Sequence, residues 1–312
     1  MFLVTGVAGF IGRSIAAELL RRGERVRGID NLCTGKLENL TSLNDLEFLE
    51  ADLNDADAVA KVCIGVDVIF HEAALPSVPR SVKDPWSSNE ANVSGTLRLL
   101  IAARSAGVKR IVYAGSSSAY GESPTLPKVE TMLPAPISPY AVSKLTGEYY
   151  MQSFTRVYGL ETVTLRYFNV FGPYQDPTSQ YSGVLAKFTR QMLANETPTI
   201  WGSGEQSRDF TFIDNVVHAN LLAARASAQA VSGRVFNIAT NSRITLNQVV
   251  TILRELTDYS GPVNNGPERS GDIKHSLADI RLAEKHLGYR VQVDFREGLR
   301  RTVEWYRMSR NH

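Results

Sequence analysis

The chain has 312 residues, 43% hydrophobic and 21% charged, which is the composition of a globular protein with enough length for one large domain or two smaller ones. Its 34 basic and 32 acidic side chains are evenly spread and leave a net charge of +2, so we expect no nucleic-acid partner. We expect no signal peptide, no membrane span of ~20 apolar residues, and two unpaired cysteines in a reducing cytoplasm.

The first half of the chain alternates short apolar, β-branched runs with longer amphipathic stretches, as in a parallel sheet covered by helices on both faces. Buried strands are predicted at Phe2–Thr5, Arg25–Ile29, Leu46–Leu49, Val66–Phe70, Arg110–Ala114 and Thr162–Tyr167. Helices are predicted at Ile11–Arg22 and Glu90–Ala106, each followed by a glycine that can end it. The predicted fold class is therefore α/β, with a doubly wound parallel sheet of the Rossmann type.

From Asn169 onward the sequence becomes richer in prolines, glycines and aromatic residues, and the alternation of strands and helices weakens. We therefore predict a first domain over residues 1–168 and a second, smaller C-terminal domain over residues 169–312. Residues 210–240 contain a helical stretch and the strand-like run Val235–Ala239, so this part is predicted to return to the first sheet.

Three glycines join the first predicted strand to the first predicted helix, in the stretch Thr5-Gly-Val-Ala-Gly-Phe-Ile-Gly12. Glycines let the backbone approach a pyrophosphate, and a helix N-terminus offers unpaired N–H donors to it. A tight turn is the alternative, but the position between a strand and a helix is the one that a dinucleotide-binding motif requires.

Asp30 ends the second predicted strand, about twenty residues after the glycines, where a carboxylate can accept hydrogen bonds from the adenosine ribose. No arginine follows it to receive a ribose phosphate, which favours NAD over NADP. Asp52, after the third strand, either reaches the adenine or is a solvated loop carboxylate.

A serine, a proline and a tyrosine at Ser138, Pro139 and Tyr140 have the form of a helix start. Lys144 would project from the same helix face one turn later, so its charge and the helix N-terminus would both stabilise a phenolate and lower the pKa of Tyr140. This pair can arise by chance on an amphipathic helix. The serines at 116–118 follow the fifth strand, where a hydroxyl can relay a proton, although a polar turn is the simpler interpretation.

With these motifs in place, the whole chain resembles the extended short-chain dehydrogenases/reductases, and specifically the UDP-sugar 4-epimerases that act on UDP-glucose or UDP-N-acetylglucosamine. The matching stretches are Thr5-Gly-Val-Ala-Gly-Phe-Ile-Gly12, His71-Glu-Ala-Ala74, Ser116-Ser-Ser-Ala-Tyr-Gly121, Ser138-Pro-Tyr-Ala-Val-Ser-Lys144, Arg166-Tyr-Phe-Asn-Val-Phe-Gly172, Arg208-Asp-Phe and Arg269-Ser-Gly-Asp272.

The resemblance implies that residues 1–168 bind NAD and that residues 169–312 mainly bind a UDP-sugar. Tyr140, Lys144 and Ser116 are the expected catalytic residues. The expected NAD contacts are Gly6, Gly9, Phe10, Ile11, Gly12, Asp30, Asn31, Asp52, Leu53, Ala73, Ala74, Asn92, Ala114, Tyr140, Lys144 and Phe168. The expected substrate contacts are Ser77, Ser116, Ser117, Tyr140, Asn169, Val184, Leu185, Trp201, Arg208, Arg269, Asp272 and Ser276. No metal ligand is expected.

Similar enzymes transiently oxidise carbon 4 of the sugar and return the hydride to the other face. In the family, a small residue four positions after the matched Asp272 admits an N-acetyl group, and Ser276 stands there. We therefore expect activity on UDP-N-acetylglucosamine as well as on UDP-glucose, and a homodimer formed by the helices near 90–106 and 140–158. Two departures, Val7 in place of a glycine and Arg13 in place of a serine, leave the geometry of the phosphate loop open.

Other functions remain open at this point. Dehydratases of the same fold need an acid pair beside the active-site hydroxyl, where this chain has Ser117 and Ser118. A UDP-glucuronate 4-epimerase or decarboxylase is a closer rival. A cofactor-binding scaffold or redox sensor without catalysis is a different class, but such proteins usually lack the tyrosine or the lysine.

Overall fold

The computed structural model describes residues 1–177, 183–268 and 274–309. The strands in these ranges are β1 (Phe2–Thr5), β2 (Val26–Asp30), β3 (Leu46–Glu50), β4 (Val68–His71), β5 (Arg110–Ser116), β6 (Glu161–Tyr167), β7 (Val170–Phe171), β8 (Thr199–Trp201), β9 (Ser207–Arg208), β10 (Thr211–Phe212), β11 (Arg234–Ile238), β12 (Ile244–Thr245) and β13 (Asn264–Gly266).

The α-helices in the same ranges are α1 (Phe10–Arg21), α2 (Ala56–Cys63), α3 (Val78–Lys83), α4 (Pro85–Asn89), α5 (Gly95–Ser105), α6 (Pro139–Tyr158), α7 (Val184–Leu193), α8 (Ile213–Arg225), α9 (Ala228–Val231), α10 (Leu246–Thr257), α11 (Arg281–Leu287) and α12 (Phe295–Ser309). Two 3₁₀ turns, η1 (Leu37–Leu40) and η3 (Ser117–Tyr120), and one π-helical segment, η2 (Glu90–Ser94), complete the described elements. None of the helices in the described ranges combines the length and the apolar character needed to cross a membrane.

Seven of the described strands form one parallel sheet in the order β11-β6-β5-β4-β1-β2-β3. This order confirms the predicted α/β fold, and each of the six predicted strands is present. The run predicted at Val235–Ala239 forms β11, which pairs in parallel with β6, so the chain does return to the first sheet. The helix predicted at Glu90–Ala106 is divided into η2 and α5, a difference that matters for Asn92 below.

Side chains from the central strands feed two apolar cores, one on each face of the sheet. Leu3 and Ile69 pack with residues of α2, α5 and α6, whereas Val4 and Phe70 pack with residues of α1 and α8. All four side chains are fully buried. Strands covered on both faces carry apolar residues at successive positions, which explains the unbroken apolar runs in the sequence.

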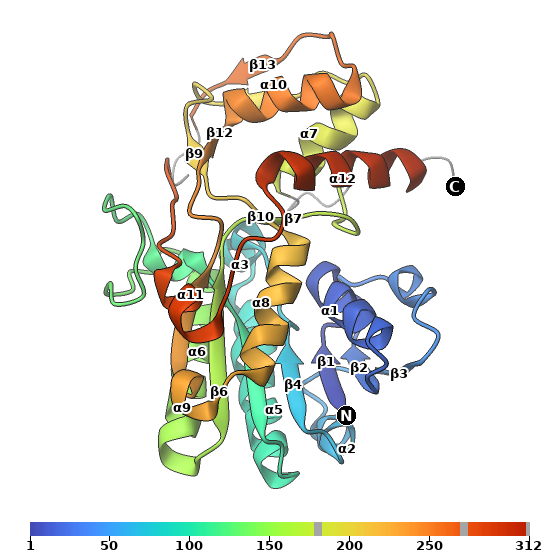
Figure 1. Ribbon diagram of the computed structural model, residues 1–312, viewed down its shortest axis with the longest axis vertical. Helices are drawn as coiled ribbons and strands as arrows, with labels where there is room; N and C mark the ends of the chain where they lie inside the picture. Colours follow the sequence, from blue (N-terminus) through green and yellow to red (C-terminus); the bar gives the residue numbers. More distant parts are fainter. Residues whose placement is uncertain (178–182, 269–273, 310–312) are drawn as a thin grey trace.

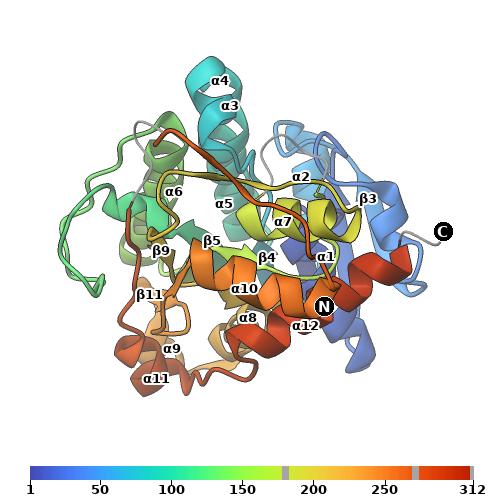
Figure 2. The ribbon, with the colours of Figure 1, turned by 90° about the horizontal axis from the view of Figure 1, so that it is seen from above.

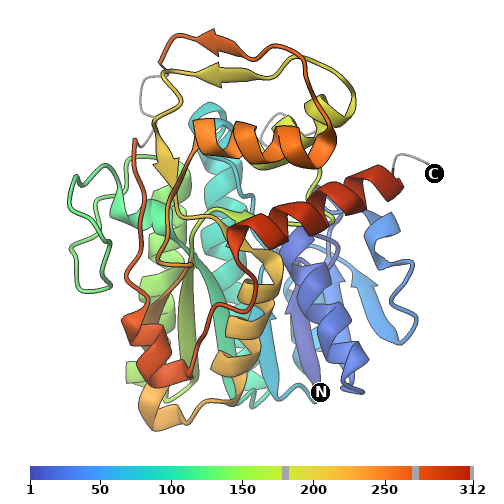
Figure 3. The same cartoon turned by 45° about the horizontal axis from the view of Figure 1, so that its top comes forward.

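Three helices from the later part of the chain lie beyond the carboxyl ends of the strands. Figure 1 shows α7, α10 and α12 stacked together above the sheet, and Figure 2 shows the same three helices from above, over its centre. β8 and β13 pair in parallel, and Figure 3 shows this short ribbon at the outer edge of the layer. Because the carboxyl ends of parallel strands carry the binding loops, this layer is positioned to cover a site there.

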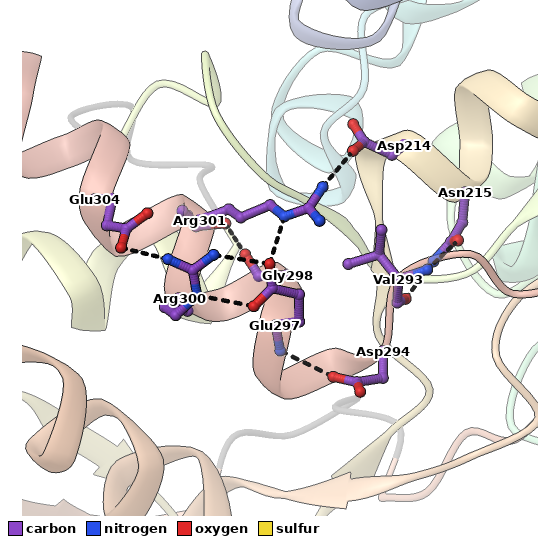
Figure 4. A network of polar contacts seen from close by, with 10 residues as sticks. Asp214, Asn215, Val293, Asp294, Glu297, Gly298, Arg300, Arg301 and Glu304 are labelled. Carbon is purple, nitrogen blue, oxygen red and sulfur yellow. Dashed lines mark hydrogen bonds and ion pairs between the residues drawn. The ribbon is translucent and has the colours of Figure 1, made fainter.

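A polar network attaches α12 and the residues just before it to the start of α8 (Figure 4). Asn215 is fully buried; its side chain donates to the Val293 carbonyl at 2.7 Å and accepts from the N–H groups of Gln292 and Val293 at 2.7 and 3.1 Å. Beside it, Arg301 forms an ion pair with Asp214 at 3.1 Å, but both side chains are about half exposed. Asn215 therefore holds the segment that leads into α12 to the helix that covers the sheet.

Replacing Asn215 with alanine should lower the free energy of unfolding by about 3 kcal/mol, because one buried carbonyl and two N–H groups lose their partner. Replacing its neighbour Asp214 with alanine should cost less than about 1 kcal/mol, since exposed ion pairs contribute little. Urea unfolding of the two variants measures both effects. Equal losses would contradict the role given to Asn215.

Candidate functional site

The turn between β1 and α1 depends on glycines for two close backbone approaches. Gly6 has a φ of +66°, and a Cβ there would lie 2.8 Å from the backbone of Ala73. A Cβ on Gly12 would lie only 2.2 Å from the Gly6 carbonyl oxygen. Gly9 caps α1 without any side-chain hydrogen bond, so the cap residue leaves the first N–H groups of the helix to other acceptors. This is the geometry of an anion site at a helix N-terminus.

Val7 occupies the position where similar enzymes often have a second glycine, and the structure explains how it fits. Its side chain is fully buried over β2, where Gly28 leaves space for it. A Cβ on Gly28 would lie 2.6 Å from a Val7 methyl carbon. The valine therefore packs against the sheet, and the path of the glycine turn is unaffected.

The Asp30 carboxylate lies at the carboxyl end of β2 and is held in place by backbone donors. It accepts hydrogen bonds from the N–H groups of Ala8 and Leu32 at 2.9 and 2.8 Å. Burial raises its pKa, and these two hydrogen bonds oppose the change. Asp52 accepts from the Asn31 side chain at 2.5 Å. Both aspartates line the large cavity described below, as the predicted adenosine site requires.

Tyr140 lies in the first turn of α6, where the sequence predicted it. Ser138 caps this helix, its hydroxyl accepting from the Ala141 N–H at 3.2 Å, and Pro139 is the first helical residue. Ser116, at the end of β5, accepts from the Ser118 hydroxyl at 2.8 Å and is a hydrogen-bond partner of Tyr140. The phenol and the serine hydroxyl thus come together although the two residues are 24 positions apart in the chain.

Lys144 is buried one turn below Tyr140, with its ammonium nitrogen 4.7 Å from the centre of the Tyr113 ring. The Tyr113 hydroxyl donates to the Lys144 carbonyl at 3.2 Å. One turn later, Glu148 forms a buried ion pair with Arg166 of β6, at 2.7 Å. These contacts fix α6 against the sheet and so fix the height of Tyr140 above it.

The expected lowering of the Tyr140 pKa is not what this structure gives. Burial raises the pKa of Tyr140, and only the hydrogen bond with Ser116 opposes the change. Burial also lowers the pKa of Lys144, since a buried ammonium is poorly solvated. The expectation considered the lysine charge and the helix N-terminus but not the desolvation of the phenol, which is the largest effect here.

Glu72 is a charged residue of this site that the sequence analysis quoted within a motif but gave no role. It follows β4, lines the same cavity as Tyr140 and Ser116, and accepts from the Tyr167 hydroxyl at 2.9 Å. Burial raises its pKa, whereas its negative charge raises the pKa of Lys144. Its position at the carboxyl end of a strand was the signal that could have identified it.

A cavity of about 690 Å³ lies along the carboxyl ends of the strands. It is lined by most of the residues predicted to contact the cofactor or the reacting sugar. These are Gly6, Gly9, Phe10, Ile11, Gly12, Asp30, Asn31, Asp52, Leu53, Ala73, Ala74, Ser77, Ser116, Ser117, Tyr140 and Asn169.

Four residues predicted to contact the cofactor are buried behind this wall. Lys144 lies beneath Tyr140, Ala114 precedes the lining residue Gly115, and Phe168 packs in the core near Tyr120. Asn92 lies in the π-helical segment η2 and is held by the Leu75 N–H at 2.7 Å and the Ser143 hydroxyl at 2.9 Å. Their proposed contacts with the cofactor stay predictions.

A second cavity of about 290 Å³ adjoins the first, and Asn169 lines both. Val184, Leu185, Trp201 and Arg208 line the second cavity, as predicted for substrate contacts. Ser276 does not line either cavity, but its hydroxyl accepts from the Asn169 side chain at 3.2 Å, which places it directly behind their junction. Arg269 and Asp272 lie outside the described residues.

Several lining residues come from segments that the sequence analysis did not connect with the site. Lys36 and Asn39 come from the stretch around η1, Tyr174 follows β7, and Trp305 belongs to α12. Their distance from the motifs in the sequence explains why no local pattern indicated them.

A model of the NAD dependent epimerase/dehydratase family matches residues 2–239. The chain belongs to this family. A UDP-glucose 4-epimerase of Mycolicibacterium smegmatis is 39% identical over 310 residues, with 98% of each chain covered. The structure of a UDP-glucose 4-epimerase from Thermotoga maritima, solved with UDP-glucose, is 39% identical and matches with a TM-score of 0.94 over 99% of each chain.

A UDP-N-acetylglucosamine 4-epimerase from Methanobrevibacter ruminantium M1, solved in complex with UDP-N-acetylmuramic acid, is equally similar in shape. It is 41% identical, with a TM-score of 0.94 over 99% of this chain and 98% of that one. This family member is thus similar to enzymes named for both plain and acetylated sugars.

Glu72→Gln should move both limbs of the pH profile of turnover to lower pH. The negative charge of Glu72 raises the pKa of Lys144. Removing that charge should therefore lower the pKa of Lys144 and of the other groups beside it that lose a proton. Measuring kcat across pH tests this.

Tyr167→Phe is the matched variant, because it keeps the carboxylate and removes only its hydrogen bond. It should shift the profile less than Glu72→Gln. A Glu72→Gln profile identical to that of the unchanged protein would show that Glu72 carries no charge that matters to catalysis.

Proposed function

We propose that this NAD-dependent family member is a UDP-hexose 4-epimerase, acting on UDP-N-acetylglucosamine and UDP-N-acetylgalactosamine and on UDP-glucose and UDP-galactose. The observation that carries this proposal is the shared wall at Asn169. The first cavity is lined by the glycine turn and by Tyr140, and the second is lined by Arg208. Because the two cavities meet at Asn169, a dinucleotide in the first and a nucleotide sugar in the second would meet at the Tyr140 phenol.

The residues of the first cavity fit NAD. The close backbone approaches at Gly6 and Gly12 keep the turn before α1 tight, so that a diphosphate can reach the N-terminus of the helix, and the carboxylate of Asp30 is positioned to accept from ribose hydroxyls. We propose that these residues hold the dinucleotide, with Asp52 near the adenine. When bound, NAD supplies the acceptor, and later the donor, of one hydride.

In the proposed mechanism, Tyr140 takes the proton of the sugar 4-hydroxyl as carbon 4 gives up its hydride. Ser116 relays this proton between the sugar and the phenol oxygen, and the positive charge of Lys144, one turn along α6, favours the phenolate. The ketone sugar then turns about its diphosphate, and Tyr140 returns the proton when the hydride comes back to the opposite face. Net redox change is zero.

This cycle requires tight binding of the nucleotide and weak binding of the sugar, which has to turn within the site. We propose that Arg208 and Arg269 bind the two phosphates, a task for which the fixed donor fork of guanidinium is suited, and that Asp272 binds the ribose. Residues 1–168 with 210–240 would form the NAD-binding domain, and the rest of residues 169–312 would mainly hold the UDP-sugar.

The choice of an acetylated sugar rests on Ser276. Its small side chain, hydrogen-bonded to Asn169 at 3.2 Å, leaves more space behind the junction of the two cavities than an aromatic ring would. UDP-glucuronate 4-epimerisation is the alternative from the same family, and the experiment below includes it.

Incubation of the purified protein with UDP-N-acetylglucosamine, UDP-glucose and UDP-glucuronate separately, followed by product separation, tests this function. We expect the 4-epimers of the first two sugars and none of the third. Tyr140→Phe should lower turnover by about a thousandfold or more, because the acid/base group is lost, while leaving NAD binding intact. Conversion confined to UDP-glucose would contradict the acetylated substrate, and full turnover by Tyr140→Phe would contradict the mechanism.

We further propose that the protein is a cytoplasmic homodimer that pairs through α5 and α6. Apolar side chains stand exposed on both helices, among them Ile101 at 53%, Tyr149 at 52% and Val157 at 65%. Exposed apolar groups that gather on adjacent helices are typical of an interface. Cys33 and Cys63 are both unpaired, as in a reducing compartment.

Ile101→Glu should convert the dimer into a monomer, since a charge would be buried without a partner in the interface. Leu133→Glu is the control, because Leu133 is 88% exposed in the loop before α6. Sedimentation velocity measures both. A monomeric unchanged protein, or a dimeric Ile101→Glu variant, would reject this interface.

A further inference from the structure

Arg13, which stands where similar enzymes often have a serine, connects α1 with Tyr174, 161 positions later in the chain. Its guanidinium donates to the Tyr174 hydroxyl at 3.0 Å and lies over the Tyr174 ring, 3.7 Å from the centre. The same side chain donates to the Ser42 hydroxyl at 2.9 Å and to the Asn39 carbonyl at 3.3 Å. One residue therefore joins three segments around the NAD-binding turn.

Tyr174 has a backbone conformation that bulky residues rarely adopt, with a φ of +68°. Such a conformation persists where surrounding contacts hold it. Arg13 holds the ring on one side, and the Trp305 ring of α12 lies 5.0 Å away, centre to centre. The next residue is held as well, because the Tyr306 hydroxyl donates to the Gln175 carbonyl.

A second connection runs parallel to the first. Lys36, beside η1, forms an ion pair with Asp176 at 3.1 Å. The Lys36 N–H and the Asn39 side chain both donate to the Ala8 carbonyl, at 3.2 and 2.8 Å, so this stretch is itself attached to the glycine turn. Lys36 and Asp176 are partly exposed, so this ion pair is the weaker of the two connections.

Residues of both connections line the large cavity. Lys36 and Asn39 come from the stretch attached to the glycine turn, and Tyr174, Asp176 and Trp305 come from the loop after β7 and from α12. We propose that Arg13, Lys36, Tyr174 and Asp176 form a clasp that holds the NAD-binding turn and the C-terminal layer together and so sets the rate at which NAD leaves.

The clasp has a purpose in the proposed function, on which this inference rests. The same cofactor molecule must remain in place between removal and return of the hydride, since a lost cofactor would strand the ketone sugar. A contact that need not touch the cofactor can provide this retention, because release requires the two walls to part. Arg13 contributes most, since a charge-assisted hydrogen bond and a stacked guanidinium are both stronger than an exposed ion pair.

The test measures NAD release without any sugar. The protein is loaded with labelled NAD and chased with an excess of unlabelled NAD, and the bound label is followed in time. Arg13→Ser should release NAD about tenfold faster, and Tyr174→Phe, which keeps the ring and removes only the hydroxyl, about threefold faster. The double variant should be no faster than Arg13→Ser, because both changes break the same contact.

Arg21→Ser is the control, since it breaks an ion pair with Glu18 on the same helix but away from the cavity. It should release NAD at the unchanged rate. The proposal is overturned if Arg13→Ser also releases NAD at that rate, or if the effects of Arg13→Ser and Tyr174→Phe multiply as independent changes do. Because no sugar is used, these outcomes are separate from a failure of the epimerase assay, which is carried out on the unchanged protein.

Discussion

The reversal of strand order at β1 is the constraint on which the rest of the site depends. β1 lies between β4 and β2. The chain leaves β1 toward the face covered by α1 and leaves β4 toward the face covered by α5, so a crevice opens between the carboxyl ends of β1 and β4. Gly6 lies at this point, against the backbone of Ala73 from the turn after β4. The cofactor cavity therefore follows from topology, and the glycines permit the close backbone approaches that shape its edge.

A second constraint is electrostatic. The wall that receives the phenol of Tyr140 is so well buried that burial opposes charge on both Tyr140 and Lys144. Glu72 adds a negative charge to the same wall and favours the protonated lysine. Burial thus favours the neutral forms of both groups, and the Glu72 carboxylate opposes this effect at Lys144.

The two departures from the usual glycine stretch are each matched by a residue elsewhere. Val7 fits because β2 has Gly28 directly beneath it. Arg13 fits because Tyr174 receives its guanidinium, although the two positions are far apart in the chain. Local sequence differences in this enzyme are therefore compensated through space, at positions that a motif does not contain.

The fold class, the six strands of the first half, the return of the run at Val235 to the sheet and the start of α6 at Ser138 could all be predicted from the sequence, because apolar runs and helix caps are local patterns of residues. The sequence also indicated most of the lining of the cavity, since parallel strands place their carboxyl ends together. The sequence did not indicate that Lys144, Asn92 and Phe168 are buried behind the cavity lining or that Glu72 and Tyr174 form part of that lining. Burial and contacts between distant segments depend on how the layers pack, and the same packing raises the pKa of Tyr140, which the charges near it in sequence would lower.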